Sequence, residues 1–128
     1  MSFANGHVHV ETYSGIENKL KMLAEETDPE FAASIVAEFC AAAPAMLSDL
    51  RDALARGDAI LACRIAHSLK SNCATFGMQN IASVLQEVEL SCKQQSALHA
   101  PAIEAIVASY QAAQQQLSRA VREVLQSA

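Results

Sequence analysis

Apolar residues recur every three or four positions through most of this chain, which is the spacing of one face of an α-helix. The pattern predicts a short helix over about 14–26 and four longer ones over about 30–56, 58–76, 78–93 and 101–126. In the second of these the face is marked by Phe31, Ile35, Phe39, Met46, Leu50 and Leu54. No segment alternates apolar and polar residues over the length of a strand.

The boundaries of these helices carry their own signals. Asp28 is a good N-cap, and the proline after it suits the first position of a helix. Gly57 ends that helix, Asp58 caps the next, and Gly77 marks a further break. Four long amphipathic helices with short connections predict an all-α fold, an antiparallel four-helix bundle with a short additional N-terminal helix. We expect a flexible tail over 1–13 and a single domain over 14–126.

Composition narrows the class of protein. A chain of 128 residues that is 52% hydrophobic can bury the core of one domain. Its net charge of −5 argues against nucleic acid or an anionic membrane as a partner. The N-terminus lacks the blocks of a signal peptide, and no apolar run approaches the length of a membrane helix, so we expect a cytoplasmic protein. The start at a methionine with its own tail suggests a free-standing protein.

The stretch AHSLKSNCATFG, residues 66–77, holds a histidine whose direction matters. Because a helix turns about 100° per residue, His67 lies about 150° from the centre of the predicted core face. It therefore points outward. That core face is formed by Ala62, Ile65, Ala66, Leu69, Cys73 and Phe76.

Small and basic residues surround this histidine on the predicted helix. The positions three, four and seven residues away hold Ile60, Cys63, Arg64, Lys70, Ser71 and Ala74. The two cations favour an anion on or near the imidazole. Neutral imidazole is a nucleophile at cellular pH, since its unperturbed pKa is about 6.5. None of the positions three or four residues away holds Asp or Glu, so the helix itself offers no magnesium site beside His67.

The same stretch resembles the signature of histidine-containing phosphotransfer (HPt) domains, roughly A-H-x-L-K-G/S followed by a glycine six residues later. In that family a leucine-bearing helix that often ends in L-E or V-E comes next, and Leu85, Val88 and Glu89 stand at matching places. The mid-helix Pro44 fits as well, and the resemblance covers about 14–126. One departure is Ser71, where many members have glycine; it adds a hydroxyl and some bulk beside His67.

The resemblance implies a phosphorelay intermediate. His67 would accept a phosphoryl group from the aspartate of one receiver domain and pass it to another. Lys70 would screen the phosphoryl oxygens, with a weaker contribution from Arg64. The partners would be the receivers of a hybrid sensor kinase and of a response regulator, which supply Mg²⁺ and acidic residues, so the chain itself needs no cofactor or metal. Members of the family are expected to be monomers without kinase activity, and this chain has no nucleotide-binding glycine loop.

The surface around His67 is then the expected docking face for a receiver. It would be formed by Ile60, Cys63, Arg64, Ser71 and Ala74, with the helix 30–56 as a second wall.

Other readings of these residues remain open. The chain could be a helical adaptor, an HPt-like module that docks receivers without phosphotransfer. A bundle enzyme with a core metal would need inward Glu-x-x-His pairs, which the sequence lacks. Cys63 and His67 form half a zinc or nucleophile–base site, with no second pair in sight. His7 and His9 could bind a metal loosely, and His99 lies in a predicted loop.

Overall fold

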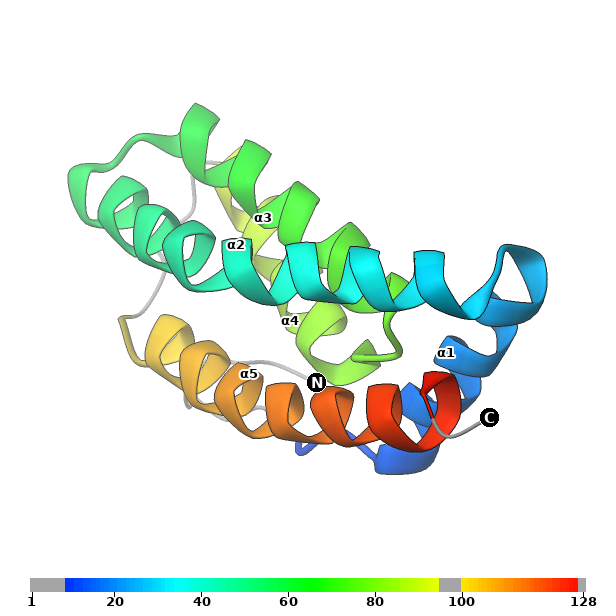
Figure 1. Ribbon diagram of the computed structural model, residues 1–128. Helices are drawn as coiled ribbons and strands as arrows, with labels where there is room; N and C mark the ends of the chain where they lie inside the picture. Colours follow the sequence, from blue (N-terminus) through cyan, green and yellow to red (C-terminus); the bar gives the residue numbers. More distant parts are fainter. Residues whose placement is uncertain (1–8, 95–99, 127–128) are drawn as a thin grey trace.

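The computed structural model describes residues 9–94 and 100–126 and is all-α, as predicted (Figure 1). Its elements are α1 (Tyr13–Glu26), α2 (Pro29–Arg56), α3 (Ala59–Thr75), α4 (Gln79–Lys93), α5 (Ala100–Ala120) and the short π-helix η1 (Val121–Leu125). Within these ranges there is no strand. The predicted loop between the last two long helices lies largely outside the described residues, and so does His99.

The helix boundaries follow the caps seen in the sequence. Asp28 Oδ1 accepts a hydrogen bond from the backbone N–H of Phe31 at 2.8 Å, and Asp58 Oδ1 accepts one from Leu61 at 3.1 Å. These bonds satisfy amides that have no partner in the first turn of a helix. Gly57 adopts a left-handed conformation with φ of 73°, which suits glycine at the end of α2.

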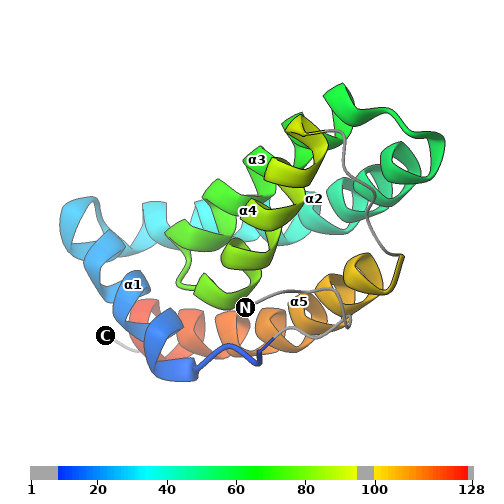
Figure 2. The same ribbon diagram turned by 180° about the vertical axis from the view of Figure 1, so that it is seen from behind.

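One apolar core joins the helices. Five of the six residues predicted for the core face of α3 are buried, and Ile65 is partly buried. α3 and α4 are adjacent antiparallel helices that pack closely, and α2 covers α3 from the other side (Figures 1 and 2). α1 lies across one end of the bundle, where it contacts α2, α5 and η1. The antiparallel bundle with a short additional N-terminal helix is thus confirmed.

The helix α2 is long and apolar enough to cross a membrane by length and composition alone, with a mean hydropathy of 1.6 over its most apolar window. The fold gives this composition another explanation. The buried side chains of α2 recur at helical spacing along the side that faces the bundle: Ala32, Val36, Phe39, Ala43, Leu47, Leu50 and Ala53. Of that apolar window, 28% is buried inside the bundle, and a single helix of this kind is weak evidence for a membrane span.

Residues 10 and 11 are tied to the start of α4, on the N-terminal side of the boundary predicted at residue 13. The carboxylate of Glu11 accepts hydrogen bonds from the backbone N–H groups of Asn80 at 3.1 Å and Ile81 at 2.6 Å, at the start of α4. The side-chain amide of Asn80 donates to the carbonyl of Val10 at 3.0 Å. We call this contact the N-terminal clasp. Part of the predicted tail 1–13 is thus in contact with the bundle, while the domain boundary itself stays a prediction and residues 1–8 lie outside the described ranges.

The C-terminal end also differs from the single predicted helix. After Ala120 the chain widens into η1, where the N–H of Gln126 donates to the carbonyl of Val121 at 3.1 Å. This last segment lies against α1, since Tyr13 donates to Glu123 at 3.2 Å. The guanidinium of Arg119 also lies 4.0 Å from the centre of the Tyr13 ring.

Candidate functional site

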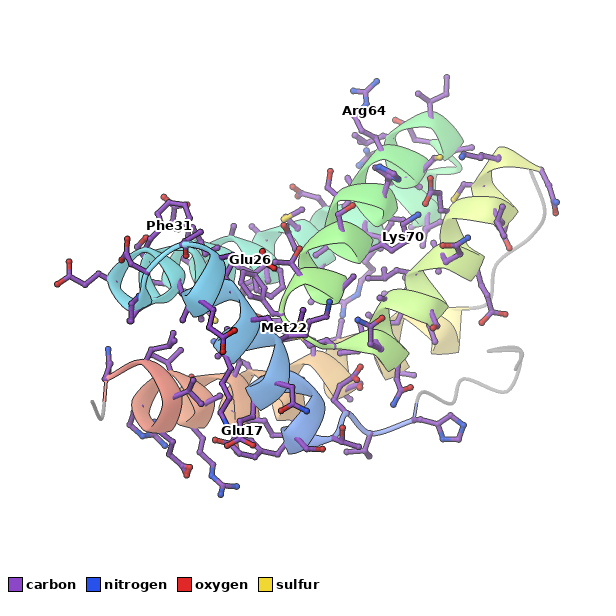
Figure 3. The ribbon with its side chains drawn as sticks, turned by 90° about the vertical axis from the view of Figure 1, so that its right-hand side faces the viewer. Glu17, Met22, Glu26, Phe31, Arg64 and Lys70 are labelled. Carbon is purple, nitrogen blue, oxygen red and sulfur yellow. The ribbon has the colours of Figure 1, made fainter. Side chains whose placement is uncertain are left out.

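The imidazole of His67 faces outward, as the helical geometry predicted. Its side chain is 60% exposed, whereas Ala66 and Leu69, which are close to it in sequence but belong to the core face of α3, are buried. Lys70, one turn further along α3, is directed toward α4, while Arg64 points away from the bundle (Figure 3). The two predicted cations therefore differ in position, and Lys70 is the one that belongs to an ordered network.

The centre of that network is Glu89 of α4. Its Oε2 lies 3.1 Å from Nδ1 of His67 and 3.3 Å from Nζ of Lys93. Its Oε1 accepts a hydrogen bond of 2.7 Å from Nζ of Lys70. One carboxylate thus holds the histidine and two lysines from two antiparallel helices.

Glu89 stays ionised in this setting although its residue is only 6% exposed. The hydrogen bond from Lys70 lowers the pKa of Glu89 most, with further lowering from Lys93 and His67, while burial acts in the opposite direction. The net effect lowers the pKa to about 2. A permanent carboxylate is an acceptor, so a neutral imidazole keeps its proton on Nδ1 and donates a hydrogen bond from there to Glu89. The lone pair is then on Nε2.

Sequence reasoning placed His67 and Lys70 correctly on one side of α3 but missed what Glu89 does. It considered only carboxylates on the helix of His67 and found none there. The acidic residue comes from the next helix, brought opposite His67 by the tight turn at Phe76, Gly77 and Met78. The signal was present, because Glu89 stands where the HPt pattern has its acidic residue, yet spacing alone gave it no role.

The predicted docking residues lie on the surface of α3 to different degrees. Ile60 is 76% exposed, Arg64 and Ser71 are exposed, and Cys63 and Ala74 are partly exposed. A groove of about 320 Å³ lies beside Lys70, Ser71 and Ala74. Its other wall is α4, which contributes Gln79, Ala82, Ser83 and Gln86. This groove therefore lies between α3 and α4, while the docking wall predicted from 30–56 belongs to α2, which also packs on α3 and stays a prediction.

No group of three or more His, Cys, Asp or Glu side chains in the described part of the chain is arranged to hold a metal ion. The suggested half-site of Cys63 and His67 gains a carboxylate neighbour in Glu89, but that carboxylate already binds two lysines. His7 lies outside the described residues, so the pair with His9 is not placed.

The site thus consists of an exposed histidine, a buried carboxylate that contacts it and two lysines bound to that carboxylate. The model of the Hpt domain matches residues 34–123, which is most of the chain and includes His67, Lys70 and Glu89. The chain belongs to the Hpt domain family. No curated protein and no solved structure matches it. Hpt domains are phosphocarriers of two-component systems that interact with receiver domains, so this chain has a role related to phosphotransfer in such a system.

Proposed function

We propose that this Hpt domain is a phosphorelay intermediate that carries the phosphoryl group on Nε2 of His67. It would receive the group from the aspartyl phosphate of a hybrid kinase receiver and pass it to the receiver of a response regulator. The observation that carries the proposal is the contact of 3.1 Å between Nδ1 of His67 and Glu89. It leaves the second ring nitrogen as the nucleophile on an exposed side chain.

The proposed transfer would use this geometry in one step. The Nε2 lone pair attacks the phosphorus of the aspartyl phosphate, the bond from phosphorus to the carboxylate oxygen breaks, and the aspartate leaves as a carboxylate. The imidazole becomes positively charged as the new bond forms, and Glu89 stabilises that charge through Nδ1–H. Phosphoryl transfer depends mainly on in-line positioning and charge neutralisation, which a fixed ring and nearby cations supply.

Lys70 and Lys93 have a second task in this scheme. Both rest on Glu89 before transfer, at 2.7 Å and 3.3 Å. A phosphoryl group on Nε2 adds negative charge next to them, and the ammonium groups can turn toward its oxygens. Lys93 is 58% exposed at its side chain, so it can do so with little loss of packing, whereas Lys70 at 22% is more constrained.

The proposal is tested by incubating the full chain with a phosphorylated receiver domain and Mg²⁺. We expect an acid-labile, base-stable phosphate on the wild type and none on His67→Gln. His9→Gln is the matched control, because it removes another exposed histidine and should accept phosphate normally. Nuclear magnetic resonance should place the phosphate on Nε2. Equal labelling of His67→Gln, or no labelling of the wild type, would make the relay function wrong and leave a module that only docks receivers.

A further inference from the structure

Two cysteines lie at facing positions one helical turn from His67. Cys63 comes four residues before His67 on α3, and Cys92 comes three residues after Glu89 on α4. The two helices run antiparallel and pack against each other (Figure 2). His67 of α3 lies opposite Glu89 of α4. Because the helices are antiparallel, a residue one turn before His67 lies opposite a residue one turn after Glu89. This register places Cys63 opposite Cys92.

The electrostatics of the pair agree with that placement. Burial raises the pKa of the Cys92 thiol, and the negative charge of a Cys63 thiolate raises it further, so the two sulfurs lie within electrostatic reach. Both thiols are free. Cys63 is only partly buried and can meet a small reagent, while Cys92 is 6% exposed and therefore largely shielded from solvent.

We propose that Cys63 and Cys92 form a redox modification site, in which peroxide converts the two thiols to an intramolecular disulfide that links α3 to α4 beside the phosphoryl site. The disulfide is independent of the proposed function. Its effect on phosphotransfer rests on that function.

The chemistry balances with hydrogen peroxide as the oxidant. The Cys63 thiolate attacks one peroxide oxygen, the O–O bond breaks, and the products are a sulfenic acid and water once the leaving hydroxide gains the thiol's proton. The Cys92 sulfur then attacks the sulfur of Cys63, the S–O bond breaks, and a second water leaves with the remaining thiol proton. Two thiols are oxidised and one peroxide is reduced to two waters.

The cross-link should change the phosphoryl site because a disulfide has strict geometry, with about 3.5–4.5 Å between the Cβ atoms. If α3 shifts relative to α4 to meet this requirement, His67 also shifts relative to Glu89, one turn away. Nδ1 of His67 and Oε2 of Glu89 are 3.1 Å apart, so a small shift weakens their hydrogen bond. The bond would also cover part of the predicted docking face, since Cys63 belongs to it.

The other two cysteines provide internal controls. Cys73 is 1% exposed, and burial raises its pKa to about 12, so it holds almost no thiolate. Cys40 is on α2, away from the α3–α4 interface, and burial raises its pKa as well. Neither is expected to react quickly with peroxide.

The test treats the full chain with hydrogen peroxide, blocks the remaining thiols and identifies linked peptides by mass spectrometry. We expect one disulfide, between Cys63 and Cys92, that dithiothreitol reverses. Cys63→Ser and Cys92→Ala should form none, while Cys40→Ser should behave like the wild type. Circular dichroism confirms that each variant is folded. A wild type that keeps all its thiols, or links them through Cys40 or between two chains, would overturn the proposal.

A second measurement compares phosphate acceptance by reduced and oxidised protein. We expect oxidation to slow acceptance on the order of tenfold, because small displacements of reacting groups are costly. Cys92→Ala, at a residue outside the predicted docking face, should accept phosphate at the same rate with and without peroxide. If the disulfide forms and the rate stays the same, the regulatory part of the proposal is wrong. Failure of the relay function itself is distinct, since reduced protein would then accept no phosphate while the disulfide still formed.

Discussion

Two glutamates of this protein are buried to the same extent and behave in opposite ways. Glu11 is 5% exposed and contacts the start of α4, while Glu89 is 6% exposed and belongs to α4 itself. Burial raises the pKa of Glu11, and the hydrogen bonds from Ile81 and Asn80 only reduce that effect. The pKa of Glu89 falls to about 2, because of Lys70 above all. Burial alone therefore does not determine what a carboxylate does here.

The difference lies in the partners. Glu11 binds two backbone amides at the start of α4, where its role is that of a helix cap supplied from a distant segment. Glu89 binds side chains that carry or gain charge, so it can respond when one of them changes. The first carboxylate stabilises the fold and the second prepares a reaction. Changing each one separates the two roles.

The largest effect is expected from Glu89→Ala. The variant loses the acceptor that keeps the Nδ1 proton and stabilises the charged ring. A hydrogen bond to a charged group is worth about 1.5–3 kcal/mol, so phosphate acceptance by His67 should slow about 10–100-fold. Glu89→Gln keeps one neutral acceptor and should lie between the wild type and Glu89→Ala. The rates are measured in single-turnover transfer from a phosphorylated receiver.

Glu87→Ala is the matched control for this series, because Glu87 lies on the same helix outside the network of Glu89. It should transfer at the rate of the wild type. If Glu89→Ala transferred phosphate at the rate of the wild type, the contact between Glu89 and His67 would have no part in catalysing transfer. The two glutamates would then not differ in function.

The sequence was informative about these regions to different degrees. Helix periodicity and the caps Asp28 and Asp58 act locally, so the bounds of the first four helices were predicted to within one or two residues. The last helix was predicted as one piece to 126, whereas α5 ends at Ala120 and η1 follows. The direction of His67 also follows from one helix. The roles of Glu11 and Glu89 depend on contacts between residues 70 and 22 positions apart, which no local pattern contains. Glu11 was assigned to a tail because the residues around it are polar and lack a helical repeat.

A smaller effect, on stability and not on transfer, is expected from Glu11→Ala. The backbone amides of Asn80 and Ile81 would lose their acceptor at the first turn of α4. Loss of such a cap costs about 1–2 kcal/mol in the free energy of unfolding, measured by urea denaturation. Glu38→Ala, an exposed glutamate of α2, is the control and should change stability little. If Glu11→Ala slowed phosphate acceptance as much as Glu89→Ala, the clasp would belong to the phosphoryl site as well.

The smallest effect is the response of the two carboxylates to pH. The folded-state pKa of Glu11 is raised above its ordinary value of 4.5, so the folded chain gains a proton there before the unfolded chain does. Stability from this group therefore rises as the pH falls through the range just above 4.5. Glu89 has the opposite sign. Its contribution is present above 4.5 and is lost as the pH falls toward about 2.

Urea denaturation of the wild type, Glu11→Gln and Glu89→Gln as a function of pH should resolve the two contributions. From neutral pH down to the range just above 4.5, the wild type should gain stability relative to Glu11→Gln, because only the wild type can take up that proton. Below that range it should lose stability relative to Glu89→Gln, since only the wild type has the ion pairs with Lys70 and Lys93 to lose. If the free energy of unfolding changed with pH in the same way for all three proteins, the pKa values of Glu11 and Glu89 would not be shifted in opposite directions.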